Sequence, residues 1–159
     1  RQLDLIKQSD VQFIWQTGKF YFDEMTAAVK AYGELPNLKV LDFISDMGAA
    51  YKAADLVISR AGASSISEFC LIGQPVILVP SPNVAEDHQT KNTMALVDKD
   101  AAVYVKDADA PATLIPTALD IVEKADKLAS LHENILKMAL KNSAEVIADE
   151  VVKLAWNEK

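Results

Sequence analysis

The sequence predicts an α/β fold: a parallel sheet with helices on both faces, followed by a helical C-terminal tail. Short β-rich runs alternate with longer helical patterns over residues 1–110, which is typical of a parallel sheet covered on both sides. After Pro111 the strand-like runs stop, and apolar residues recur at helical spacing. With 159 residues, of which 50% are hydrophobic, the chain is long enough for one well-buried domain.

Five strands are predicted from short apolar runs rich in β-branched residues. They are Val11–Gln16, Val40–Phe43, Leu56–Ser59, Val76–Val79 and Ala102–Val105. Polar or glycine-containing segments follow the first four. Because parallel strands all point the same way, these segments are expected to meet at one edge of the sheet, where ligands usually bind.

Helices are predicted between the strands. The segment FYFDEMTAAVKAYG predicts a helix that stops at Gly33, and SDMGAAYKAA predicts one with Ser45 as its N-cap. Residues 65–72 and about 87–98 form two more, and the tail forms two or three amphipathic helices that pack on the same domain. The first ten residues resemble the last turns of a helix and lack an initiator methionine, so either a strand precedes them in a longer chain or the numbering follows an expressed segment.

Composition argues against several classes of function. A net charge of −7 works against binding to nucleic acid or anionic lipid. No apolar run approaches the roughly 20 residues that span a bilayer, and no signal peptide is recognisable, so a soluble intracellular protein is expected. The single cysteine, Cys70, is predicted to be a core thiol, and His132 a surface or packing residue. The histidine and cysteine spacing predicts no zinc site, and dinucleotide, P-loop and serine-hydrolase motifs are lacking.

The loop after the third strand carries the first candidate site. The segment RAGASSISE, Arg60 to Glu68, places a glycine and three serines at a helix start near Ser64 or Ser65, whose free N–H groups can bind a diphosphate. Ser65-Ile-Ser-Glu68 also fits a capping box, in which the glutamate bonds only its own helix end. A carboxylate repels phosphate, so a ligand-binding Glu68 would suit a pair of sugar hydroxyls. Local pattern leaves both interpretations open.

The loop after the fourth strand carries the second candidate site. His88 and Asn92 lie one helical turn apart and share a face, with Gln89 beside them. These side chains offer hydrogen-bond donors and acceptors that suit a polyhydroxylated ligand. A solvated first turn of a helix would show the same residues, so the pattern alone leaves this open as well.

Taken together, the loop sequences resemble a known family. The segments are IWQTGK, VLDFISDMGAAYKAADLVI, SRAGASSISEFCLIGQPVILVP and EDHQTKNTMALVDKDAAVYV, and they resemble the C-terminal half of the MurG glycosyltransferases. The resemblance runs from about Val11 to Val105. It implies one half of a GT-B glycosyltransferase, in which two Rossmann-like domains face each other across a cleft. It further implies that residues 1–110 bind UDP-GlcNAc and that residues 111–159 are helices of the same domain. The chain would then be a fragment that lacks the N-terminal acceptor domain and the first strand of the donor-binding domain.

The resemblance also implies roles for individual residues. The backbone of Ile44 would read the uracil, Glu68 would bind the ribose hydroxyls, and Gln89 and Asn92 would bond the GlcNAc hydroxyls. His88 stands where many members have a glutamine. The implied substrate-binding residues are Ile44, Gly62, Ala63, Ser64, Ser65, Ile66, Ser67, Glu68, His88, Gln89 and Asn92. No catalytic residue is expected in this fragment, and neither a metal nor another cofactor.

The family transfers GlcNAc from UDP-GlcNAc to undecaprenyl-diphospho-MurNAc-pentapeptide in peptidoglycan biosynthesis, with inversion. The resemblance therefore implies the donor-binding half of such an enzyme, inactive alone and cytoplasmic, with the full enzyme peripheral on the inner face of the cell membrane. The lipid-linked acceptor and the membrane would be contacted outside this domain. The alternatives are another GT-B lipid glycosyltransferase, a UDP-GlcNAc epimerase, or a non-catalytic nucleotide-sugar-binding subunit.

Overall fold

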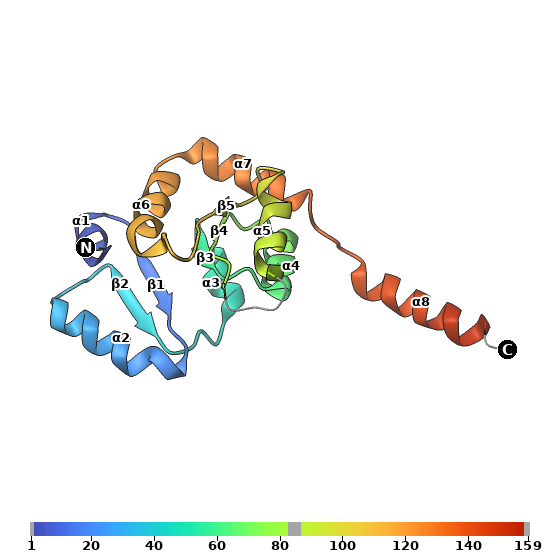
Figure 1. Ribbon diagram of the computed structural model, residues 1–159, viewed down its shortest axis with the longest axis horizontal. Helices are drawn as coiled ribbons and strands as arrows, with labels where there is room; N and C mark the ends of the chain where they lie inside the picture. Colours follow the sequence, from blue (N-terminus) through green and yellow to red (C-terminus); the bar gives the residue numbers. More distant parts are fainter. Residues whose placement is uncertain (1, 83–86, 158–159) are drawn as a thin grey trace.

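The computed structural model describes residues 2–82 and 87–157, and its helices and strands alternate as predicted (Figure 1). The strands are β1 (Phe13–Gln16), β2 (Leu38–Leu41), β3 (Val57–Ser59), β4 (Val76–Leu78) and β5 (Val103–Tyr104). The helices are α1 (Gln2–Gln8), α2 (Lys19–Tyr32), α3 (Met47–Ala53), α4 (Ala63–Ile72), α5 (His88–Val97), α6 (Ala110–Val122), α7 (Ala125–Leu136) and α8 (Ser143–Asn157). All five predicted strands are present, with ends shifted by up to two residues. The helical character predicted for the first ten residues is confirmed by α1.

The strands form two parallel sheets, where the sequence predicts one. β1 pairs with β2, and β4 lies between β3 and β5. With the two sheets side by side, the strands follow in the order β2-β1 and then β3-β4-β5 (Figure 1). This order matches a doubly wound sheet whose strands are ordered 3-2-1-4-5-6. No strand among the described residues occupies the place of strand 1, between β1 and β3. Ile14 and Trp15 of β1 and Ile58 of β3 are correspondingly exposed.

The main core surrounds β4. Val76, Ile77 and Leu78 are each 0% exposed. Val76 and Leu78 belong to one cluster with Phe69 of α4, whereas Ile77 belongs to another with Leu131 of α7. Because successive strand residues point to opposite faces, a strand covered by helices on both sides is apolar throughout, as the VIL sequence of β4 is.

The β1-β2 sheet has a separate, smaller core. Ile6 of α1 and Ile115 of α6 are both buried there, so these helices join the two-stranded sheet to the rest of the domain. Asn37, just before β2, adds a polar anchor. Its Nδ2 donates hydrogen bonds to the carbonyl oxygens of Ile6, Ser9 and Val11, at 2.7, 3.1 and 3.0 Å. One buried amide therefore holds α1 and the start of β1 in place.

Two predicted helix starts differ from the structure. The N-cap of α3 is Asp46 instead of Ser45, because the Oδ1 atom of Asp46 accepts a hydrogen bond from the N–H of Ala49 at 2.9 Å. The helix α4 begins at Ala63, ahead of the predicted start at Ser64 or Ser65, because Gly62 is its extended N-cap residue. The predicted stop of α2 at Gly33 is confirmed.

The three tail helices have different surroundings. α6 and α7 contribute buried residues to the cores described above. The expectation that the whole tail packs on the domain does not hold for α8, which projects away from the other elements (Figure 1). Its described side chains are all exposed, including Val151 at 59% and Leu154 at 68%. Among the described residues, no helix is both long and apolar enough to cross a membrane.

Candidate functional site

The loops after β1 and β2 are joined by one hydrogen bond. The side-chain Oε1 atom of Gln16, the last residue of β1, accepts a bond from the backbone N–H of Ile44 at 2.8 Å. Beside it, the backbone N–H of Thr17 donates to the carbonyl of Leu41 at 2.9 Å. The loop that leads into α3 is therefore held against the end of β1. The backbone of Ile44, predicted to read a base, lies in this loop with its N–H already bonded.

The start of α4 follows β3 directly. The first helical bond runs from the N–H of Ile66 to the carbonyl of Gly62 at 3.0 Å, so the N–H groups of Ala63, Ser64 and Ser65 precede the helical ladder. No side chain of the described residues caps this helix start. Three backbone donors and the positive end of the helix dipole therefore lie at the carboxyl edge of β3.

Three other residues of this segment differ in their surroundings. Ile66 is buried in the core, and the Ser67 hydroxyl donates to the carbonyl of Ala63 at 3.0 Å within its own helix. Gly62 has an ordinary φ of −67°, so the backbone does not require glycine, but the nearest atom to an added Cβ would be Ser65 Oγ at 4.0 Å. The space beside Gly62 is open.

Glu68 belongs to no capping box, so that interpretation is wrong. Because α4 starts at Ala63, Ser65 already lies inside the helix, and no side chain of the described residues caps its start. The Glu68 carboxylate instead accepts a hydrogen bond at 3.2 Å from the hydroxyl of Tyr51, on α3. Sequence analysis missed Tyr51, because no local pattern links a residue of one helix to a carboxylate on another.

Gln89 connects two further loops. Its Oε1 atom accepts bonds from the N–H groups of Ala61 at 3.3 Å and Ser81 at 2.8 Å, which follow β3 and β4. Its side-chain NH₂ group carries the remaining donors. His88 and Asn92 lie one turn apart on α5 as predicted, the first exposed and the second half-buried. Part of the long loop before α5, residues 83–86, lies outside the described residues.

Arg60 is a second residue that sequence analysis did not identify. Its guanidinium donates to the carbonyl of Val79 at 3.2 Å and forms an ion pair with the carboxylate of Asp107. These contacts join the ends of β3 and β4 to the segment after β5. The 47-residue separation from Asp107 explains why the sequence does not reveal the pair.

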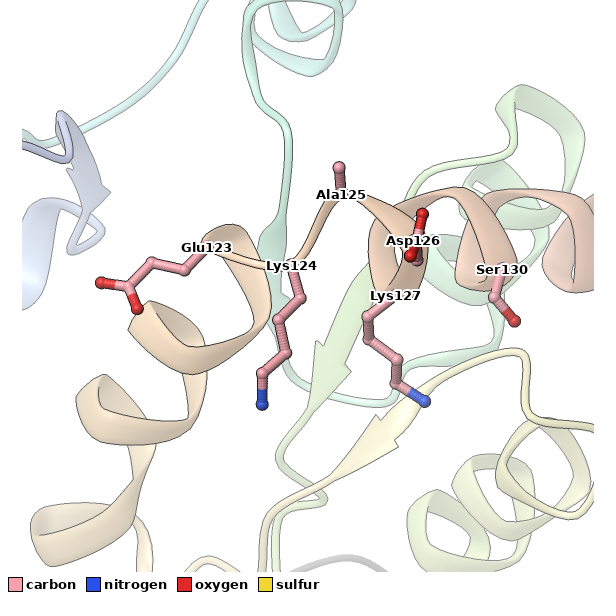
Figure 2. A pocket seen from close by; sticks show the side chains of 6 residues that line it. All are labelled: Glu123, Lys124, Ala125, Asp126, Lys127 and Ser130. Atoms are coloured by element: carbon pink, nitrogen blue, oxygen red, sulfur yellow. The ribbon is translucent and has the colours of Figure 1, made fainter.

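Two surface hollows are formed by the described residues of α6 and its neighbours. One of about 560 Å³ lies at the turn between α6 and α7, where the side chains of Lys124 and Lys127 extend to the same side (Figure 2). Lys124 is paired there with Asp120 at 2.6 Å. The other, of about 500 Å³, lies between the end of β5 and α6. Among residues 2–82 and 87–157, no group of three or more His, Cys, Asp and Glu side chains could hold a metal ion.

The residues predicted to be structural are structural. Cys70 is 5% exposed in the core, and burial raises the pKa of its thiol. His132 packs against the end of α4, where its Nδ1 atom lies 2.6 Å from the carbonyl oxygen of Gly73. Gly73 has a φ of 71°, and a Cβ there would lie 2.6 Å from the His132 ring. Only glycine suits this helix end.

The fold and the loop cluster define a Rossmann-like α/β domain, whose ligand edge carries an uncapped helix start after β3. The comparison with protein families is specific. This chain belongs to the glycosyltransferase family 28 C-terminal domain, whose family model matches residues 1–151. This match, the curated relatives and the MurG crystal structure together confirm the resemblance to the C-terminal domain of the MurG glycosyltransferases.

Individual relatives agree with this assignment. The chain is 68% identical over 154 residues to the UDP-N-acetylglucosamine–N-acetylmuramyl-(pentapeptide) pyrophosphoryl-undecaprenol N-acetylglucosamine transferase of Bacteroides fragilis ATCC 25285, covering 96% of this chain and 40% of that protein. The protein of the same name from Bacteroides thetaiotaomicron is 66% identical over 152 residues, with 96% and 41% covered. The chain thus spans about two-fifths of the length of these relatives.

Solved structures confirm the fold class. The crystal structure of Acinetobacter baumannii MurG superposes with a TM-score of 0.81 at 29% identity, over 96% of this chain and 47% of that one. Glycosyltransferase VinC in complex with DTDP gives a TM-score of 0.64 at 17% identity, over 85% of this chain and 31% of that one, and shows the fold alone. The fold is that of the C-terminal half of a GT-B glycosyltransferase.

Proposed function

We propose that this chain is the donor-binding half of an inverting glycosyltransferase that moves GlcNAc from UDP-GlcNAc to undecaprenyl-diphospho-MurNAc-pentapeptide, a step of peptidoglycan biosynthesis. The observation that carries the proposal is the 68% identity to a protein whose name states this transfer. Residues 1–110 would hold the donor, and residues 111–159 would support them. The acceptor, the catalytic base and the contact with the cytoplasmic face of the membrane would belong to the rest of the enzyme.

The start of α4 is the proposed diphosphate site. The N–H groups of Ala63, Ser64 and Ser65 precede the helical ladder, and the helix dipole favours an anion there. As the acceptor hydroxyl attacks the anomeric carbon, negative charge develops on the departing UDP. Backbone donors already fixed in place stabilise that charge without reorganisation, which lowers the barrier.

The nucleoside would lie between α3 and α4. Glu68 offers two acceptor oxygens to the ribose hydroxyls, and Tyr51 already orients its carboxylate. The Ile44 loop would read the uracil. Because Gln16 accepts the bond from the Ile44 N–H, the carbonyl of Ile44 is the backbone group left to accept the uracil N3–H.

The sugar would lie against the start of α5. The oxygen of the Gln89 side chain is bonded to two backbone N–H groups, so its NH₂ group is the part that would donate to a GlcNAc hydroxyl. Asn92 and His88 share the adjoining face one turn apart. His88 would supply a ring nitrogen where a glutamine amide is usual in the family.

Calorimetry with UDP-GlcNAc tests this proposal directly. The chain should bind UDP-GlcNAc without hydrolysing or transferring the sugar. Glu68→Ala should weaken binding by about 1–3 kcal/mol, because the ribose hydroxyls lose their acceptor. Glu133→Ala, on the exposed surface of α7, is the matched control and should bind as the unaltered chain does.

Two results would contradict the proposal. If a folded chain does not bind UDP-GlcNAc, neither a donor-binding half nor a nucleotide-sugar-binding subunit remains tenable. If the chain alone transfers GlcNAc to the lipid-linked acceptor, the assignment of the base and acceptor site to the rest of the enzyme is wrong.

A further inference from the structure

We infer that Tyr51 is a positioning residue that holds the Glu68 carboxylate toward the nucleoside, so that it sets the preference of the site for a ribose over a 2′-deoxyribose. The inference rests on the proposed function, in which Glu68 binds the ribose hydroxyls. Tyr51 lies on α3 and is not among the substrate-binding residues that the sequence resemblance implies.

The geometry supports this role. Tyr51 lies on α3 and Glu68 on α4, 17 residues apart, and the phenol hydroxyl donates to Oε2 of Glu68 at 3.2 Å. Glu68 is exposed, and an exposed glutamate otherwise samples several rotamers. One fixed donor on Oε2 reduces that freedom. Each carboxylate oxygen has two lone pairs, so Oε1 and the second lone pair of Oε2 remain for two neighbouring hydroxyls.

Tyr51 is itself rigidly placed. Its ring packs edge to face on Phe69, with ring centroids 5.7 Å apart and an interplanar angle of 81°. Phe69 is 1% exposed, and Tyr51 packs against the core cluster that contains it. The hydroxyl is thus presented from the core to a carboxylate at the surface. The donor can hold Glu68 at little further cost in conformational entropy.

Folding favours the protonated form of the Tyr51 phenol, which is the hydrogen-bond donor. Burial raises the pKa of Tyr51, and the charge of Glu68 raises it further. The Tyr51 hydroxyl therefore keeps its proton to higher pH than an ordinary tyrosine does. The same helix, α3, has Asp46 as its N-cap and follows the Ile44 loop directly. The proposed base-reading loop and the donor that orients the ribose-binding group are therefore neighbours in the chain.

The test compares UDP with 2′-deoxy-UDP in Tyr51→Phe. This variant keeps the ring and its contact with Phe69 and removes only the hydroxyl. We expect the affinity for UDP to fall about 5-fold, less than for the loss of a direct hydrogen bond to a charged group, because Tyr51 acts on the ribose only through Glu68. The affinity for 2′-deoxy-UDP should fall less than about 2-fold. The ratio of the affinity for UDP to the affinity for 2′-deoxy-UDP therefore becomes smaller in Tyr51→Phe.

Tyr32→Phe is the matched control, because the Tyr32 hydroxyl also donates to a carboxylate, that of Asp4, away from the proposed site. It should leave both affinities unchanged. In a Glu68→Ala background, Tyr51→Phe should have no further effect on UDP binding, since Tyr51 then has no carboxylate to position.

The outcomes separate this inference from the proposed function. If Glu68→Ala weakens UDP binding but Tyr51→Phe leaves discrimination unchanged, Tyr51 has no positioning role and the proposed function stands. The same conclusion follows if Tyr51→Phe lowers only the melting temperature. It also follows if Tyr51→Phe weakens UDP binding by the same factor in the unaltered chain and in the Glu68→Ala background. If Glu68→Ala has no effect on UDP, the ribose role of Glu68 and this inference are both wrong.

Discussion

The two sheets of this domain have similar apolar strands and very different burial. In the three-stranded sheet, the residues of β4 are 0% exposed, whereas Ile14 and Trp15 in β1 of the two-stranded sheet are 54% and 39% exposed. The difference comes from neighbours: β4 lies between two strands and two helical layers, and β1 pairs only with β2 among the described strands. An apolar strand is therefore buried by its partners and not by its own composition.

The same division runs through the proposed donor site. The loop that would read the base, with Ile44, leaves the two-stranded sheet, whereas the groups proposed for diphosphate and sugar leave the three-stranded sheet. We expect base recognition to depend on the less buried part of the molecule. The phosphate and sugar contacts would depend on the main core.

The largest expected effect is on the main core. Leu131→Ala removes a side chain that is 0% exposed beneath β4 and should lower the free energy of unfolding by about 2–5 kcal/mol, measured by urea denaturation. Leu154→Ala, at an α8 site that is 68% exposed, is the matched control and should change it by less than about 0.5 kcal/mol. Equal effects of the two substitutions would show that burial does not set how much these two leucines contribute to stability.

The next effect should stay within the two-stranded part. Asn37→Ala leaves the carbonyls of Ile6, Ser9 and Val11 without this donor and should cost about 1–3 kcal/mol. In hydrogen exchange, amides of β1 and β2 should lose protection while those of β4 keep theirs. Asn134→Ala is the control, because the Nδ2 atom of Asn134, on α7, donates to the exposed carbonyl of Asp100. Uniform loss of protection across both sheets would show that they unfold as one unit.

Sequence patterns predicted most of the fold because they report local and burial constraints. The alternating runs identified all five strands, and the continuous VIL run of β4 indicated a strand covered on both faces. They could not predict the separation into two sheets, which depends on which strands lie side by side. The Ser65 capping box failed for a related reason: the extended backbone of Gly62 starts the helix earlier than the serine pattern suggests.

The candidate site was predictable as a set of loops, and its internal bonds were not. Strand direction alone brings the segments after β1 to β4 to one edge. The bonds of Tyr51 to Glu68 and of Gln89 to Ala61 join residues 17 and 28 positions apart, on different elements. Such pairs depend on the folded backbone, and a single sequence carries no local signal for them.

A smaller effect should appear in base recognition. Gln16→Ala removes the acceptor for the Ile44 N–H and loosens the loop after β2, so UDP-GlcNAc affinity should fall by about 1 kcal/mol with little change in overall stability. Calorimetry measures the affinity. Gln2→Ala removes a side-chain bond to the carbonyl of Ala110 elsewhere in the same part of the molecule, and it should leave binding unchanged. If both variants bind normally, the Ile44 loop does not read the base.

The smallest effect should be the acid sensitivity of the two-stranded part. The hydrogen bond from Tyr32 is the main cause that lowers the pKa of Asp4 below its ordinary value of 3.8. A carboxyl group whose pKa is depressed by folding stabilises the folded state above its unfolded pKa, and that stabilisation is lost as the pH falls through the folded pKa. Melting temperatures of the unaltered chain and of Asp4→Asn should therefore differ slightly at neutral pH and converge on acidification below 3.8. Tyr32→Phe should remove the larger part of this pH dependence, because its hydroxyl is the first of several groups that lower the pKa of Asp4. In that background, Asp4→Asn should change the melting temperature less than it does alone. A pH dependence of unchanged size in both variants would assign it to other carboxyl groups.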